Sequence, residues 1–101
     1  MTTVARWLDR HTGSAPGPLR DRVRAQVLAR SSTGSIPHAL AEAGWDALRQ
    51  VLSHAGDRSA ALDLLAADAL VTLALLAQAE AAPEHLDEFA ASILGAIRPV
   101  A

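Results

Sequence analysis

Residues 58–81 have the sequence RSAALDLLAADALVTLALLAQAEA and form the longest apolar run of the chain. Alanine and leucine, two strong helix formers, make up most of this run, and no glycine or proline interrupts it. The preceding pair, Gly56 and Asp57, has the residue types of a helix stop followed by an N-cap. The pattern therefore predicts one long helix of about 36 Å.

The expected helix over 58–81 is apolar on two sides. A second, smaller apolar set lies roughly opposite the broad face and consists of Leu64, Val71 and Leu75. A helix that is apolar nearly all round is normally covered on all sides, which predicts a central position in a bundle. The broad face holds Leu62, Leu65, Ala66, Ala69, Leu70, Leu73, Leu76 and Ala77.

A second copy of the chain is the occupant we expect on the smaller apolar set. A chain of about 100 residues buries only around two thirds of its surface, so covering both faces internally is demanding. We therefore expect a homodimer with Leu64, Val71 and Leu75 at its interface. The alternative is that the other helices of the same chain surround the central helix completely.

Four further helices are expected around the central one, over residues 3–11, 18–30, 37–54 and 83–98. Each has apolar residues at helical spacing, and glycine, proline or serine residues separate them. Gly44 lies on the inward stripe of the helix over 37–54, where a missing side chain predicts the close approach of another helix. Ser35, directly before Ile36 and Pro37, is typical of an N-cap.

Composition supports the same fold class. The chain has 101 residues, of which 23 are alanine and 15 leucine, against three aromatic residues. We therefore predict an all-α fold, a compact bundle of four to five helices in a single domain over residues 1–101. The absence of cysteine excludes disulfides, thiolate chemistry and cysteine-ligated zinc, and we expect no cofactor.

We expect a cytoplasmic protein with no membrane span. The N-terminal residues include Arg6 and Asp9 and lack the apolar core of a secretory signal. The long apolar run carries Asp63 and Asp68, each of which would cost about 2.5–3.5 kcal/mol near a bilayer centre. Much alanine and arginine without lysine is typical of a GC-rich bacterial genome.

Charge is distributed unevenly along the chain. Residues 1–30 carry a net charge of +4 and residues 31–101 a net charge of −6, which gives −2 in total. The basic helix over 19–30 contains Arg20, Arg22, Arg24 and Arg30, which could contact the phosphates of a nucleic acid. The alternative, which we favour, is that this basic third docks on the acidic remainder of the chain.

Asp68 and Thr72 are the other candidate polar site, one helical turn apart between the two apolar faces. A carboxylate buried there would have a raised pKa and could act as a base or hold a cation. The alternative, which we favour, is a boundary residue that pairs with an arginine or reaches water.

The histidines give no metal motif, and only Glu84, His85 and Glu88 share a face. We favour a solvated helix face over a metal site for these three. The sequence thus predicts a non-catalytic protein that acts through self-association or by binding another protein. The alternatives are a nucleic-acid-binding protein and a ligand-binding or enzymatic domain centred on Asp68.

Overall fold

The start of each long helix is set by a local cap. The Asp57 carboxylate accepts a hydrogen bond from the backbone N–H of Ala60 at 2.8 Å, and Gly56 adopts a φ of 105°, which favours glycine. The Ser35 hydroxyl oxygen accepts from the backbone N–H of His38 at 3.4 Å. Both predicted N-caps are confirmed.

A computed structural model describes residues 3–29, 34–53 and 56–97, with only the backbone of residues 96 and 97. The predicted all-α bundle is confirmed, and the described residues contain no strand. The radius of gyration of 13.2 Å is that of a well-packed chain of this length. The elements are α1 Thr3–His11, α2 Gly17–Leu28, α3 Ile36–Ser53, α4 Arg58–Ala81, the short 3₁₀ turn η1 Pro83–His85, and α5 Leu86–Ile97.

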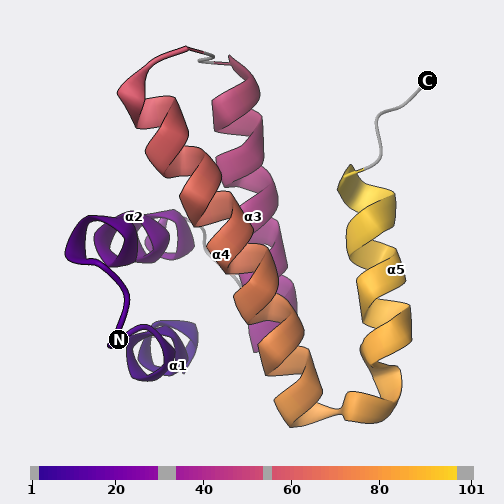
Figure 1. The fold of residues 1–101 in the computed structure, drawn as a ribbon. Helices are drawn as coiled ribbons and strands as arrows, with labels where there is room; N and C mark the ends of the chain where they lie inside the picture. The colour runs from indigo at the N-terminus through magenta and orange to yellow at the C-terminus, as the bar shows by residue number, and fades with distance from the viewer. Residues whose placement is uncertain (1–2, 30–33, 54–55, 98–101) are drawn as a thin grey trace.

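The helices α3 and α4 form an antiparallel hairpin at the centre of the molecule (Figure 1). They approach each other closely at Gly44, where an added Cβ would lie 3.2 Å from the Leu70 Cβ and 3.4 Å from the Ala67 carbonyl oxygen. The predicted close approach at Gly44 is confirmed. Small side chains on both helices permit this separation, because nothing larger stands between the two backbones.

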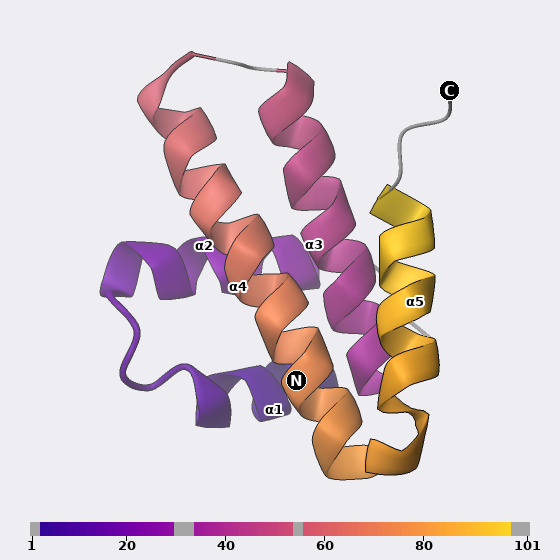
Figure 2. The ribbon, with the colours of Figure 1, turned by 45° about the vertical axis from the view of Figure 1, so that its right-hand side comes forward.

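The other helices lie on two opposite sides of this hairpin. The helices α1 and α2 form a second antiparallel pair that crosses the hairpin on one side, while α5 runs back along the opposite side (Figure 2). The core is a continuous cluster to which every α-helix contributes. Its buried members are Trp7, Leu8, Val23, Val27, Leu40, Ala43, Ala66, Leu70, Ala74, Ala77, Phe89 and Ile93.

The buried face of α4 is different from the predicted one. Alanine supplies most of it, with Leu70 as the one leucine among the buried residues of this helix. Leu65 and Leu76, which the sequence pattern places on the broad apolar face, are 56% and 42% exposed. The reason is the close approach of α3, which selects the alanine side of α4 for the contact and leaves these leucines pointing outward.

Two smaller expectations are also corrected. The apolar spacing of residues 37–54 places Leu52 on the same inward stripe as Gly44, but Leu52 is 71% exposed in the last turn of α3. Pro83 opens a 3₁₀ turn, and α5 begins only at Leu86. The same kind of spacing predicts inward positions for Ala55 and Ile97, but Ala55 and the Ile97 side chain lie outside the described residues.

The helix α4 is long and apolar enough to cross a membrane, with a mean hydropathy of 2.0 over its most apolar window. In the bundle 39% of that window is buried, and the core helix of a soluble protein meets the same criteria. The expectation that α4 does not span a membrane therefore stays a prediction.

Candidate functional site

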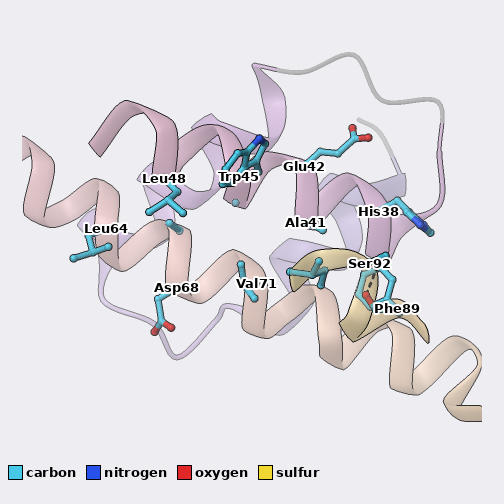
Figure 3. Close-up of a pocket in the computed structure, with 13 residues that line it drawn as sticks. His38, Ala41, Glu42, Trp45, Leu48, Leu64, Asp68, Val71, Phe89 and Ser92 are labelled. Carbon is cyan, nitrogen blue, oxygen red and sulfur yellow. Dashed lines mark hydrogen bonds between the residues drawn. The ribbon is translucent and has the colours of Figure 1, made fainter. Parts of the chain in front are cut away.

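An apolar groove lies where α3, α4 and α5 meet, and it encloses about 440 Å³. Side chains from all three helices line it, and Figure 3 shows them from one side. Its lining residues are His38, Ala41, Glu42, Gly44, Trp45, Leu48, Leu64, Ala67, Asp68, Val71, Phe89, Ser92 and Ile93.

The small residues of the helical hairpin account for the depth of the groove. Gly44 and Ala67 lie at the closest approach of α3 and α4, so little side-chain volume fills the space above them. Larger side chains rise on either side, with Trp45 and Leu48 on α3 and Leu64 on α4 (Figure 3). The groove is therefore a consequence of the same contact that holds the hairpin together.

The helix α5 closes one end of the groove. Phe89 is 5% exposed, and its ring meets the His38 ring edge-on at a centroid distance of 5.3 Å. Ser92 donates its hydroxyl hydrogen to the Phe89 carbonyl oxygen at 2.8 Å, so this hydroxyl is already bonded within α5. Leu64, 51% exposed, lines the part of the groove on the first half of α4.

Acidic side chains lie at the edges of the groove. Figure 3 shows the Asp68 carboxylate pointing away from α3 and the Glu42 carboxylate pointing away from α4. Both residues are exposed, and among the described residues no cation pairs with Asp68. On the α3 side, the Arg49 guanidinium carbon lies 5.6 Å from the Trp45 ring centroid, and Arg49 also forms an ion pair with Asp46. The groove thus combines an apolar interior with an acidic border.

Comparison of the chain with protein-family models, with curated proteins and with solved structures finds no match. The interior of the groove offers apolar contact and the aromatic faces of Trp45 and Phe89, which suit an apolar group. Its edges offer carboxylates, which suit a positive charge.

The residues predicted for the dimer interface lie on the same side of α4 as this groove. Leu64 and Val71 line it, whereas Leu75 lies one turn beyond Val71. Val71 and Leu75 are partly buried against the core of the same chain. The expected dimer through these three residues stays a prediction, and within one chain only Leu64 is strongly exposed.

The candidate buried site of Asp68 and Thr72 does not form within the single chain, because both residues are exposed on α4. The carboxylate that this helix does bury is Asp63, which is 6% exposed. Asp63 lies on the alanine-rich face of α4 that packs against the neighbouring helices, whereas Asp68 lies on a different face. Asp68 instead occupies the boundary position, next to a cavity.

The arginines predicted to bind anions are partly engaged within the chain. Arg22 Nη1 lies 3.1 Å from Asp63 Oδ1, in a direction that does not form a hydrogen bond, so the contact is an ion pair alone. Arg24 forms an ion pair and hydrogen bond with Asp9, which raises the pKa of the guanidinium. Arg20 is exposed, and Arg30 lies outside the described residues.

A separate polar cluster joins α1 to the end of α4. The Trp7 indole N–H donates to Glu80 Oε1 at 3.1 Å, and His11 Nε2 lies 3.2 Å from Glu80 Oε2. The His11 and Trp7 rings stack at a centroid distance of 3.9 Å. The hydrogen bonds from His11 and then from Trp7 lower the pKa of Glu80. This cluster is a structural contact between helices, because its members bond to one another.

The described residues gather no group of three metal-ligating side chains. Glu84, His85 and Glu88 are all exposed, and His85 Nδ1 lies 3.9 Å from Glu88 Oε2. Their positions along η1 and the first turn of α5 agree with the solvated face that the sequence favoured.

Proposed function

We propose that this chain is a non-catalytic interaction module that binds an amphipathic helix of another protein in the groove between α3, α4 and α5. The observation that carries the proposal is the apolar cavity of about 440 Å³ bordered by acidic side chains. Helix-in-groove binding uses such a surface, in which apolar anchors of the partner enter a cleft and polar residues remain at its border.

The length of the groove supports a helix as the occupant. Its lining runs from His38 to Leu48 along α3, which corresponds to about 15 Å of helix. A partner helix of about three turns presents apolar anchors over that length at positions i, i+3 or i+4, and i+7. We expect a basic residue beside these anchors, because the exposed Asp68 carboxylate borders the groove.

A small apolar molecule with a positive charge is the second candidate occupant. Two observations favour it: Asp68 is next to a cavity, and the cavity volume falls within the usual range of about 300–1,000 Å³ for ligand sites. Such a ligand would place its apolar part near Trp45 and Phe89 and its charge near Asp68. A carboxylate ligand is disfavoured by the same acidic border.

Nucleic-acid binding receives less support. Two of the four proposed arginines, Arg22 and Arg24, form ion pairs within the chain. A cytoplasmic location remains part of the proposal.

The proposal is tested by titrating ¹⁵N-labelled protein with two designed amphipathic peptides, one built from leucine and lysine and one from leucine and glutamate. The chain has two tryptophans, Trp45 in the groove and Trp7 of α1 in the core, so their indole N–H signals report on two separate places. We expect the basic peptide to shift the Trp45 signal saturably and to leave the Trp7 signal in place.

Matched variants locate the binding surface. Leu64→Lys changes an exposed leucine of the groove, and Leu94→Lys changes a leucine of α5 that is 67% exposed and does not line it. We expect Leu64→Lys to weaken peptide binding by roughly tenfold or more and Leu94→Lys to leave it unchanged.

Absence of binding to either peptide would overturn the proposal. Binding of dodecyltrimethylammonium below its micelle concentration, without peptide binding, would establish the second candidate instead.

A further inference from the structure

The outward face of α4 is a second apolar surface, which meets the groove at Asp68. Leu65, Thr72 and Leu76 lie on it and are exposed, and among the described residues no helix packs over them. Positions 61, 65, 68, 72, 75 and 79 follow each other at spacings of four and three, which is the pattern of a coiled-coil seam. This face is therefore shaped to meet another helix.

The order of residue types along this seam is the same in both directions. From either end it runs small, leucine, polar, polar, leucine, small. The six residues are Ala61, Leu65, Asp68, Thr72, Leu75 and Ala79. An isologous contact requires a surface to be complementary to itself under a two-fold rotation, and an antiparallel helix pair satisfies this requirement here.

We propose that two copies of the chain associate through this face, with their α4 helices antiparallel. In that register Ala61 meets Ala79 of the second copy, and Leu65 meets Leu75. The Thr72 hydroxyl then faces Asp68 of the second copy, where it donates a hydrogen bond to the carboxylate, and the symmetric contact repeats it. A parallel pair would instead bring the two Asp68 carboxylates together, which costs energy.

This interface differs from the one that the sequence suggested. Val71 takes no part in it, because Val71 lies beside Gly44 in the groove. Leu75 is shared between the two versions, and Leu65 replaces Leu64 as the exposed leucine. Asp68 belongs both to this seam and to the groove, whereas the other five seam residues do not line the groove.

Disulfide cross-linking tests the register, because the chain has no cysteine of its own. An equimolar mixture of Ala61→Cys and Ala79→Cys is expected to form the mixed disulfide dimer. Ala61→Cys alone is expected to form little, because its two copies would lie about 27 Å apart along the seam at 1.5 Å per residue. Efficient self-linking of Ala61→Cys would indicate a parallel pair and overturn the proposal.

Sedimentation equilibrium tests the interface itself. We expect the unmodified chain to dimerise at micromolar concentrations and Leu65→Asp to raise the dissociation constant by roughly tenfold or more. Leu52→Asp is the matched control, since it adds the same charge at an exposed leucine of α3 and is expected to leave the constant unchanged. A chain that stays monomeric up to about 1 mM, or equal effects of the two variants, would overturn the proposal. Circular dichroism verifies that each variant is folded.

Discussion

At the scale of single residues, Gly44 in α3 and Gly95 in α5 differ in what surrounds them. A Cβ added at Gly44 would lie 3.3 Å from Val71 Cγ2 and 3.2 Å from Leu70 Cβ. A Cβ added at Gly95 would meet nothing within 4 Å. Glycine at position 44 is therefore a packing requirement of the hairpin, whereas glycine at position 95 only reduces helix propensity.

This difference gives a paired prediction. Gly95→Ala is expected to raise the free energy of unfolding by up to about 1 kcal/mol, because alanine is the better helix former. Gly44→Ala gains the same propensity but crowds α4, which typically costs about 1–3 kcal/mol. We therefore expect it to be about 1 kcal/mol or more less stable than Gly95→Ala in urea denaturation. Equal stabilisation by both variants would contradict this prediction, because it would show that α4 accommodates a Cβ at position 44 without cost.

Asp63 shows how a charged residue can lie inside an apolar helix. It is buried on α4, and Arg22 of α2 supplies the positive charge beside it. The Arg22 side chain is 34% exposed, so it remains in partial contact with water while its guanidinium lies beside the Asp63 carboxylate. This pair also makes the basic helix α2 part of the fold, which agrees with the favoured expectation that the basic third docks on the acidic remainder.

At the scale of elements, α1 is fastened to the end of α4 by the cluster of Trp7, His11 and Glu80. Both ring nitrogens of His11 face acceptors, because Nδ1 lies 2.8 Å from the Trp7 carbonyl oxygen and Nε2 faces the Glu80 carboxylate. These contacts lower the pKa of Glu80, so the cluster is a pH-dependent contact between two helices.

The lowered pKa of Glu80 predicts the direction of this dependence. The hydrogen bonds from His11 and Trp7 favour the ionised carboxylate in the folded state, so the unfolded state binds more protons as the pH falls. The stability that Glu80 contributes is present above its ordinary pKa of 4.5 and is lost as the pH falls through the lower folded-state value. We expect Glu80→Gln to be less stable than the unmodified chain near neutral pH, with the gap closing in acid.

Urea denaturation over a series of pH values measures this gap. Glu84→Gln serves as the control, because Glu84 is an acidic residue of η1 that does not bond to Trp7 or His11. The gap for Glu80→Gln is expected to change more over this pH range than the gap for Glu84→Gln. A gap for Glu80→Gln that is unchanged between neutral and acidic pH would contradict the predicted sign.

At the scale of the whole molecule, buried side chains are unevenly distributed between the two sides of the α3–α4 hairpin. The hairpin of α3 and α4 lies at the centre and is covered on one side by α1 and α2 (Figure 1). On the other side, the described side chains of α5 include only two buried residues, Phe89 and Ile93. Few buried apolar contacts are typical of a segment that opens locally. The helix that closes the groove is thus the one held least firmly.

Amide hydrogen exchange tests this distribution. We expect amides of α5 to exchange roughly tenfold or more faster than those in the middle of α3 and α4, because α5 can detach while the hairpin stays intact. Amides around Leu40 and Leu70, both fully buried, are the internal reference. Equal protection of α5 and of this reference would show that the bundle opens only as a single unit. Adding the basic peptide is expected to slow exchange in α5, because the peptide would contact its groove-facing side.

The sequence by itself determined the local features of this protein. Alanine and leucine content, the caps at Ser35 and Asp57, and the glycine of the hairpin led to the right fold class, to all five α-helices and to the close approach at Gly44. The helices and their caps follow from interactions between residues near one another in the chain, and the missing side chain of Gly44 marks in the sequence where another helix can come close.

Only the tertiary structure decided which side of α4 is buried. The wheel of this helix is apolar almost all round, so its pattern cannot distinguish a face packed with alanine from one packed with leucine. The separation of α3 and α4 makes that choice: it buries alanine, exposes Leu65 and Leu76, and opens the groove beside Asp68. This distance depends on how all the helices pack at once, and no single stretch of sequence encodes it.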